Sequence, residues 1–453
     1  MNRRHEIRET LNLALPIAFA QIALMAMGLV DAAIVGRVSE ADLAAVSIGN
    51  ALVFALTCPG MGVTMAVEPL ASQAVGAGDL DRAWASLRAG LVACAWLTVP
   101  TLILTAASPL VLDPLGVDAA IIPATRRYVL ARTPSVPFWL IFMTAKAYLE
   151  ARGLTRPLYI GGWAANVVNF VAVGTLVLGD EALARVGLPA IGLPALGTLG
   201  AGLGTTISSA VLAGFALLAA WKARPAGARL FGGGDETRGV TRKLLRVGVP
   251  IGLQVLTEAG VFSISTLLAG KLGARTAAEH QIAIGLASFN FMGVLGVSSA
   301  TAVRVGRAIG AREEGGPRRA GLVGIGIAAV YMGACAVVFL VFARLLARLF
   351  TAEPALIASS VTLIHIAAAF QIADGIQGVA GGALRGMGDT RFASAANVIG
   401  HWVVGLPLVL LFGFTLGHGA QGIWWGLCTG LFVVSAMLTL RFWRRSGDII
   451  EAL

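Results

Sequence analysis

Long stretches without a charged residue recur along the whole chain, and each is long enough to cross a membrane as a helix. A membrane-spanning helix needs about 20 mainly apolar residues. Such stretches cover residues 43–67, 89–112, 157–179, 186–221, 280–303, 320–343 and 392–440. The last has room for two helices, which we expect to meet at Gly417-His418-Gly419. These long runs favour helices over membrane strands, whose segments are short and alternate.

Four more segments are mainly apolar but carry isolated charges. They are 10–36 with Asp31, 247–270 with Glu258, 354–384 with Asp374, and a weaker one at 128–149 that contains Arg132 and Lys146. The whole pattern therefore predicts an all-α membrane protein with twelve transmembrane helices.

The composition supports a membrane protein and excludes most soluble classes. Of the 453 residues, 57% are hydrophobic and only 13% are charged, whereas a soluble domain has about 25% charged residues. The net charge is +10, and residues 222–246 carry seven Lys or Arg while residues 304–319 carry five. Cytoplasmic loops carry such a basic excess, so we expect a multi-pass protein of the bacterial inner membrane with both termini cytoplasmic. We also expect a monomer surrounded by membrane lipids, with no nucleic-acid partner.

The first half of the sequence resembles the second at a shift of about 234 residues. Leu15-Pro16-Ile17 corresponds to Val249-Pro250-Ile251, and Ala74-Val75-Gly76-Ala77 corresponds to Ala308-Ile309-Gly310-Ala311. Because each half has an even number of spans, the halves share one orientation in the membrane. We therefore expect two six-helix lobes, 1–222 and 244–453, joined by a cytoplasmic linker at 223–243 and related by a pseudo-two-fold axis along the membrane normal.

Two duplicated lobes are typical of a transporter whose path opens to either side in turn. A membrane-embedded enzyme, an alternative from another class, needs a nucleophile, a base or a metal cluster, and the sequence shows no such motif. The run Gly200-Ala201-Gly202-Leu203-Gly204 lies in an uncharged stretch, where close helix packing explains it. We expect no enzymatic activity and no cofactor other than a coupling ion.

Three acids lie inside apolar spans, where a charge at mid-bilayer costs about 2.5–3.5 kcal/mol. Glu258 has 11 uncharged residues before it and 12 after it, and Asp374 has 20 before it and 10 after it. Asp31 lies six residues before Arg37, so an interfacial ion pair is an alternative to a functional role there. Spans keep acids where these face a cavity or a partner, so we predict that all three bind the coupling ion and the substrate.

Buried carboxyl groups suit coupling to H+ or Na+. Burial disfavours the ionised form, so such a group can exchange a proton near neutral pH. Carboxylate oxygens also suit a hard cation, and Glu258 and Asp374 form a possible Na+ site. A cationic lipophilic drug competes for the same charge, and this competition produces antiport. For Glu68 we favour structural hydrogen bonding, whereas His365 and His401 are either satisfied polar residues or parts of a proton path.

Several segments make the sequence similar to the MATE family of multidrug and toxic compound extrusion transporters, in its NorM-type branch. They are LALPIAFAQ and GLVDAAIVGR within 13–37, GVPIGLQVLTEAGVFSISTLLAGKLG (248–273), AAEHQIAIGLASFNF (277–291) and FQIADGIQGVAGGALRGMGDTR (370–391). The resemblance covers about residues 8–440. It implies efflux of cationic drugs, and hence antibiotic resistance, driven by inward Na+ or H+ flow. It also implies key acids on the first, seventh and tenth helices, which fall on Asp31, Glu258 and Asp374.

The family pattern also implies supporting polar residues. Gln254, four residues before the seventh-helix acid, matches the family's spacing. Of two asparagines that often lie four apart on the fifth helix, Asn169 matches the first, Val173 replaces the second, and Asn166 is additional. Phe370 stands where a tyrosine often precedes the tenth-helix acid. Both departures remove neutral oxygen ligands, which shifts the expectation toward H+ while Na+ stays open.

A lipid-linked oligosaccharide flippase on a related two-lobe fold is the alternative function. Such a carrier binds anionic cargo, so Arg or Lys should line its cavity. The deep charges of this chain are acidic, while Arg132 and Lys146 lie toward opposite ends of their span. The sequence therefore favours a cation-coupled antiporter that exports cationic amphiphilic compounds.

Overall fold

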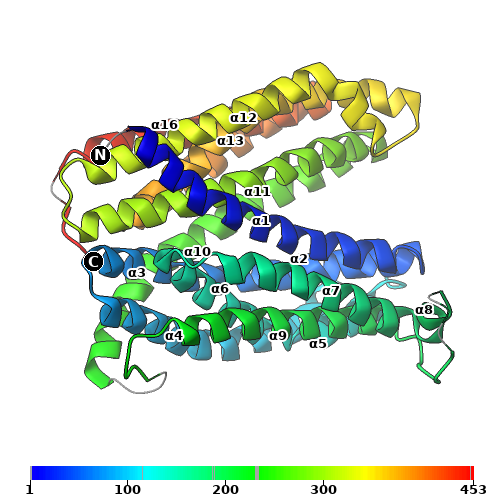
Figure 1. Ribbon diagram of the computed structural model, residues 1–453. Coiled ribbons are helices and arrows are strands. Elements are labelled where there is room, and N and C mark those ends of the chain that lie inside the picture. The colour runs from blue at the N-terminus through cyan, green and yellow to red at the C-terminus, as the bar shows by residue number, and fades with distance from the viewer. Residues whose placement is uncertain (1–2, 115, 186, 188, 230–233, 449) are drawn as a thin grey trace. The chain divides into compact units, whose positions relative to one another are not determined.

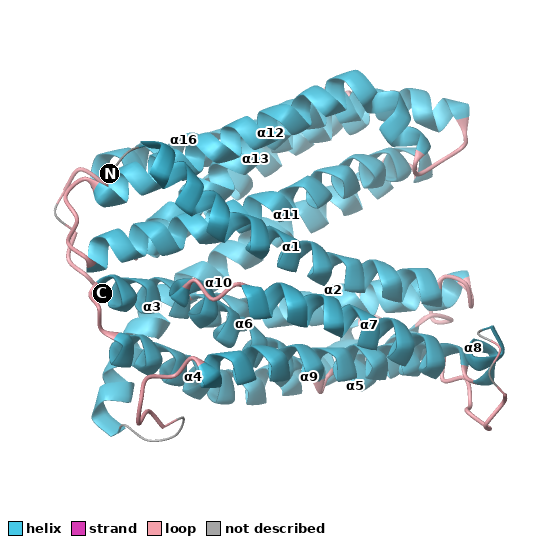
Figure 2. Cartoon of the chain, viewed as in Figure 1, coloured by secondary structure: helices cyan, strands magenta, loops and turns pink. Residues whose placement is uncertain are grey.

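The computed structural model describes residues 3–114, 116–185, 187, 189–229, 234–448 and 450–453. These residues form helices and loops, and no strand occurs among them (Figure 1, Figure 2). The first half contains α1 (Arg3–Val35), α2 (Glu40–Met65), α3 (Val67–Gly76), α4 (Leu80–Ala107), η1 (Ser108–Val111), α5 (Ile122–Arg132), α6 (Ser135–Arg152), α7 (Arg156–Leu178), α8 (Asp180–Arg185) and α9 (Thr198–Lys222). The second half contains α10 (Gly234–Lys271), α11 (Ala274–Gly310), α12 (Gly316–Arg348), α13 (Pro354–Met387), α14 (Thr390–Asn397), the π-helical η2 (Val398–Gly405), α15 (Leu406–Leu410), the π-helical η3 (Leu411–Thr415) and α16 (Gly419–Arg445).

Helix occupies most of each predicted span within the described residues. Within the described residues, eleven helical segments are long and apolar enough to cross a membrane. The weaker span at 128–149 corresponds to α5 and α6, which follow one another across Thr133 and Pro134. Helices such as α10 and α11 run beyond the uncharged stretches, because charged residues can continue a helix outside the apolar layer. The fold class is thus confirmed as an all-α, multi-pass membrane protein.

The predicted span 186–221 is wrong at its start. Residues 189–197 are not helical, and α9 begins only at Thr198. Pro189 and Pro194 lie in this segment, and proline lacks the N–H group that a helix interior needs. An uncharged stretch is therefore too coarse a signal for a helix start, because it ignores the backbone.

Asp180, at the start of α8, ties down the segment before α9. Its carboxylate accepts hydrogen bonds from the backbone N–H groups of Ile191 (3.1 Å), Gly192 (3.0 Å) and Leu193 (3.1 Å). The bonds from Leu193 and Ile191 hold the pKa of this exposed carboxyl below its usual range. The segment is therefore fixed to α8 although it is not helical.

The helices divide into two compact units. The C-terminal unit comprises Met1–Ala18, Glu68–Asp79 and Arg246–Leu453, and the N-terminal unit comprises Phe19–Val67 and Leu80–Leu245. This division differs from the predicted boundaries, because the start of α1 and most of α3 pack with C-terminal helices. An ion pair contributes to that packing: Arg304 of α11 lies 2.6 Å from the carboxylate of Glu6.

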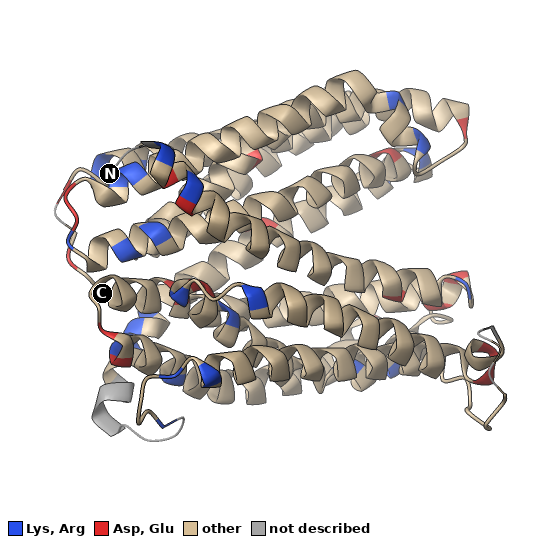
Figure 3. Cartoon of the chain, viewed as in Figure 1, with Lys and Arg blue, Asp and Glu red and all other residues tan. Residues whose placement is uncertain are grey.

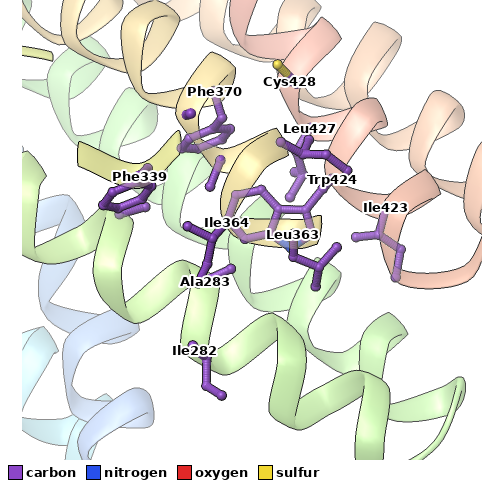
Figure 4. Close-up of a cluster of buried hydrophobic side chains, with 14 of the residues drawn as sticks. Ile282, Ala283, Phe339, Leu363, Ile364, Phe370, Ile423, Trp424, Leu427 and Cys428 are labelled. Atoms are coloured by element: carbon purple, nitrogen blue, oxygen red, sulfur yellow. The ribbon is translucent and has the colours of Figure 1, made fainter. Parts of the chain in front are cut away.

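In the C-terminal unit, α13 takes the central place. It packs against α11, α12 and α16 (Figure 1). Figure 4 shows a buried cluster in this unit, in which Phe370 of α13 and Trp424 of α16 lie among aliphatic side chains. Charged residues gather toward the ends of the helices and few occur midway (Figure 3). Gln371, Asp374 and Gln377, on the middle of α13, are buried within this unit.

In the N-terminal unit, α9 takes the central place and packs against α5, α6 and α7. Its glycines permit this close approach: a Cβ atom on Gly204 would overlap Val173 of α7, and one on Gly202 would overlap the backbone of α5. The run from Gly200 to Gly204 is thus confirmed as a helix-packing feature.

The sequence repeat is visible in the geometry of the C-terminal unit. A Cβ atom on Gly76 of α3 would overlap the backbone of Arg307, and one on Gly310 of α11 would overlap the backbone of Gln73. The two glycines are 234 positions apart, and so are Gln73 and Arg307. Reciprocal contacts between equivalent residues are what a local two-fold relation produces. The helix ends at this point therefore pack as repeat-related partners.

Candidate functional site

Asp31 lies on α1 in the N-terminal unit, and only 5% of the residue is exposed. Thr205 of α9 donates a hydrogen bond from Oγ1 to Oδ2 of Asp31 at 2.8 Å. The other carboxylate oxygen, Oδ1, has no hydrogen-bond partner among the described residues. Arg37 is exposed, so the geometry favours a buried polar site over the interfacial ion pair.

Asn169 of α7 lies beside Asp31. It is fully buried, and neither its Oδ1 nor its Nδ2 has a hydrogen-bond partner in the part of the chain that the structure describes. Asn166, one turn earlier, donates instead to the backbone oxygens of Ala23 (2.7 Å) and Gly162 (2.9 Å). The structure therefore brings Asn169 to the acid, whereas Asn166 fastens α7 to α1.

Two residues of α5 also approach Asp31, and sequence reasoning does not place either of them at a site. Arg132 donates a hydrogen bond to the hydroxyl of Tyr128, and its guanidinium carbon lies 5.8 Å from the Tyr128 ring centroid. Both side chains are close enough to interact electrostatically with Asp31. Arg132 is visible in the sequence as a charge within a weak span, whereas nothing in the sequence marks Tyr128.

In the C-terminal unit, Glu258 of α10 and Asp374 of α13 come together. Asp374 is 6% exposed and Glu258 is half-buried. The two carboxyl groups are close enough for their charges to interact. Neighbouring carboxylates repel each other when both are ionised, so a bound proton or cation stabilises such a pair.

Amide side chains adjoin these two acids. Gln377, one turn after Asp374 on α13, donates toward the carboxylate of Glu258. Its Nε2 also lies 3.4 Å from Oδ1 of Asn397, the last residue of α14. Gln254, one turn before Glu258, faces α13 as well. Sequence reasoning identifies Gln254 and misses Gln377 and Asn397, since no spacing links α14 to the acids.

Aromatic side chains form a wall beside the acids, partly drawn in Figure 4. Phe370 of α13 meets Phe262 of α10 edge-on at 6.0 Å between centroids, and it meets Trp424 of α16 at 5.4 Å. Phe262 follows Glu258 by one turn, and Phe370 precedes Asp374 by one turn. Phe370 therefore contributes an apolar surface here and no oxygen ligand.

The three residues with open roles occupy distinct places. His401, in the π-helical η2, is 1% exposed, and its ring lies 6.2 Å from that of Phe262. Its Nε2 has no hydrogen-bond partner among the described residues. His365 is exposed on α13, so it does not join this cluster. Glu68 of α3 accepts a hydrogen bond of 3.1 Å from Ser299 Oγ of α11, which agrees with the structural role favoured for it.

An arginine accompanies the acids in each unit. Arg385 of α13 is close enough to attract Glu258, and it also donates to Ser298 Oγ at 3.2 Å. Arg132 stands in the same relation to Asp31. No group of three or more His, Cys, Asp or Glu residues suited to a metal occurs in the described ranges. A bound cation would therefore need amide, hydroxyl or backbone oxygens in addition to the carboxylates.

Comparison with known proteins assigns a family. A family model, MatE, matches residues 16–175 and 250–411. The chain is 35% identical over 455 aligned residues to a probable multidrug resistance protein NorM from Bradyrhizobium diazoefficiens, covering 96% of this chain and 93% of the relative. It is 32% identical to the multidrug resistance protein PmpM from Pseudomonas aeruginosa, covering 99% of this chain and 93% of the relative.

Solved structures share the fold. A crystal structure of the eukaryotic MATE transporter AtDTX14 superposes with a TM-score of 0.84 at 18% identity, covering 99% of each chain. An outward-facing multidrug resistance MATE family transporter of the MOP superfamily superposes with a TM-score of 0.84 at 17% identity, covering 98% of this chain and 96% of that one. At such identities the likeness concerns the arrangement of the helices alone.

Proposed function

The chain belongs to the MatE family of membrane transporters and is not an enzyme, and from that premise we propose that it is a multidrug efflux antiporter. It exports cationic amphiphilic drugs in exchange for H+ or Na+ by alternating access. The observation that carries this proposal is the pair Glu258 and Asp374, two carboxyl groups within apolar helices that are close enough to interact. The drug-resistance names of the relatives support the substrate class.

Competition at the acids explains the exchange. A proton or sodium ion that enters reduces the repulsion between Glu258 and Asp374, and a bound drug cation does the same. Since either cation satisfies the same charge, binding of one weakens binding of the other by a coupling free energy that acts in both directions. Phe262, the half-buried member of the aromatic wall, offers a π face to a lipophilic cation.

We propose H+ as the coupling ion at Glu258 and Asp374, with Na+ as the alternative. Phe370 gives that pair no oxygen ligand. The N-terminal site is richer in free oxygens, because Oδ1 of Asp31 and Oδ1 of Asn169 are unpaired among the described residues. Together with the hydroxyl of Thr205, these are the hard ligands that a cation such as Na+ accepts. If Na+ contributes to coupling, we place it at Asp31.

We further propose a monomer in the bacterial inner membrane with both termini cytoplasmic. In the C-terminal unit, the start of α1 contacts Arg304, and the backbone N–H of Leu453 donates to Gln73 at 2.7 Å. Gln73 contacts the end of α11, so both chain ends lie near the turn between α11 and α12. The five basic residues around that turn favour the cytoplasmic side; they are Arg304, Arg307, Arg312, Arg318 and Arg319.

The surroundings of the arginines do not support the flippase alternative. Arg132 and Arg385 each lie beside an acid, which balances their charge. An anionic cargo requires cations that its own phosphate groups can pair with. We therefore keep a cationic substrate as the proposal.

A resistance assay tests the proposal. Glu258→Gln and Asp374→Asn should each reduce ethidium and norfloxacin efflux to background in cells that lack their own efflux pumps. Glu279→Gln is the matched control, because Glu279 is a buried acid of the same unit that pairs with Arg275 at a helix end (3.3 Å). Protein amount in the membrane is measured for each variant. Normal resistance in both site variants at equal amounts would contradict the proposal.

A further inference from the structure

Two amide side chains, Gln377 and Asn397, connect Glu258 to the eleventh predicted span, which is the helical segment Thr390–Thr415. Asn397 of α14 donates from Nδ2 to the backbone oxygen of Ala393 at 2.9 Å. Its Oδ1 therefore faces Gln377, whose Nε2 lies 3.4 Å away. The side chain of Gln377 also lies within hydrogen-bonding reach of the carboxylate of Glu258. Each amide fixes the orientation of the next, so Gln377 presents a donor and not an acceptor to the acid.

Both amide residues are buried, and a buried polar group without a hydrogen-bond partner destabilises the fold. Gln377 is 1% exposed and Asn397 is fully buried. Oε1 of Gln377 has no hydrogen-bond partner among the described residues. A buried unpaired oxygen costs about 1–3 kcal/mol, so a glutamine whose only role is packing is a poor choice here. Its Nε2, in contrast, has an acceptor in Oδ1 of Asn397, so the hydrogen bonding of Gln377 is made through its donor end.

The π-helical η2 allows the segment Thr390–Thr415 to contact α10 in addition to Gln377. Trp402 of η2 donates from Nε1 to the backbone oxygen of Thr257 at 3.0 Å, and its ring lies against Gly260. These two residues flank Glu258. On an α-helix, Asn397 and Trp402 would point about 140° apart, whereas π-helical bonds join residues five apart and bring them to one face. One face of the segment Thr390–Thr415 therefore contacts both α10, which carries Glu258, and the side chain of Gln377.

We propose that Gln377 and Asn397 are positioning residues that hold the Glu258 carboxylate toward Asp374 for exchange of the coupling ion. This inference rests on the proposed function of Glu258. A donor beside a carboxylate stabilises its ionised form. The other titratable or charged groups near Glu258 are Asp374 and Arg385 of α13, while His401 of η2 contacts the neighbouring Phe262.

The test compares two buried glutamines of α13. Gln377→Ala removes the donor to Glu258, and Gln371→Ala is the matched control. Gln371 is fully buried on the same helix, one turn before Asp374, and its Oε1 accepts from Asn290 Nδ2 at 2.6 Å. Both changes delete one buried amide from one helix, so a structural effect alone should be similar in the two variants.

The readout is the pH dependence of ethidium transport by the purified full chain in proteoliposomes. For Gln377→Ala we expect the pH of half-maximal transport to rise by about one unit, a tenfold change in proton affinity. Asn397→Ala should move it in the same direction by less, and Gln371→Ala should leave it in place. If Na+ drives transport, the corresponding quantity is the half-saturating Na+ concentration, which should rise about tenfold.

Two results overturn the inference. One is an unchanged profile for both Gln377→Ala and Asn397→Ala, and the other is an equal shift for Gln371→Ala. Asn397→Ala carries the test alone if Gln377→Ala does not fold. Glu258→Gln is measured alongside: if it transports normally, the proposed function fails, whereas an inactive Glu258→Gln with unshifted amide variants rejects the positioning role alone.

Discussion

The two acid sites differ in how their charges are held. In the N-terminal unit a single carboxylate, Asp31, accepts a bond from Thr205 and stands beside an asparagine with two unpaired polar atoms. In the C-terminal unit two carboxyl groups share a setting of amides and aromatic rings. A single acid with spare oxygens suits direct binding of a cation, whereas two neighbouring acids suit exchange of one positive charge for another.

The internal repeat accounts for the recurring helices of the two halves, but it does not account for the difference between the two acid sites. At a shift of 234 residues, Asp31 of α1 corresponds to Ser265 of α10, and Glu258 of α10 corresponds to Leu24 of α1. The helices recur while the acids do not. A duplicated fold thus carries two different polar sites, and we expect substitutions at the two to have different consequences.

The largest expected effect separates the two sites. Glu258→Gln or Asp374→Asn should lower the initial rate of ethidium efflux about 100-fold or more, because each removes a charge that the exchange requires. Asp31→Asn should lower it about tenfold. The rates are measured in cells containing equal amounts of each variant. An equal loss for all three substitutions would break the proposed distinction between the sites.

The hydroxyl beside Asp31 provides the next test. Thr205→Val removes its hydrogen bond to the carboxylate, and bonds to charged groups contribute about 1.5–3 kcal/mol. We expect the half-saturating Na+ concentration to rise about tenfold in proteoliposomes, because the ionised carboxylate that would bind Na+ is stabilised less. Thr206→Val is the neighbouring control, since Thr206 donates to the backbone oxygens of Ala131 and Gly202. A similar rise in the control would show that packing, and not the bond to Asp31, matters.

The two asparagines of α7 should separate transport from stability. Asn169→Ala should reduce transport severalfold with little change in Tm, because among the described residues its amide has no partner beyond the adjacent Asp31. Asn166→Ala should lower the stability by about 1 kcal/mol through loss of its bonds to α1 and α7. Thermal unfolding of the purified variants and ethidium transport are measured together. The reverse pattern would refute the placement of Asn169 at the site.

The smallest effect concerns the repeat itself. Gly78 and Arg312 lie 234 positions apart, and both have positive φ, 77° and 53°. Gly78→Ala should cost about 1 kcal/mol, because a side chain is strained in that conformation. In Arg312→Gly the relief of strain is offset by a freer unfolded chain, so stability should change by less than about 0.5 kcal/mol. Thermal unfolding measures both changes, and transport by the folded proteins should stay normal.

The apolar pattern predicts the fold well, since bilayer thickness sets a length that each span must meet. It fails at residues 189–197, where charge is absent but Pro189 and Pro194 disfavour helix. It also assigns the start of α1 and α3 to the first lobe, although their contacts lie in the C-terminal unit. Such assignments depend on tertiary packing, which a one-dimensional pattern of charge does not contain.

The acids of the site are predictable because a charge within a membrane span costs free energy, so the few charges that occur there stand out in the sequence. The residues that contact these acids are not predictable in the same way. Thr205, Tyr128 and Asn397 are ordinary polar residues in the sequence. Thr205 and Tyr128 reach Asp31 from helices far along the chain, and Asn397 contacts Gln377, which lies beside Glu258. Phe370 and Asn169 could be named only through the family resemblance. The structure adds what each of them does, namely packing for Phe370 and an unpaired amide for Asn169.

Transport in proteoliposomes with separately imposed pH and Na+ gradients tests the central claim most directly. We predict that a gradient of H+, of Na+ or of both drives ethidium transport by the unaltered chain without any nucleotide. Glu258→Gln should abolish the gradient-driven component. Transport that responds to neither gradient, or that persists at full rate in Glu258→Gln, would contradict coupling through the buried acids.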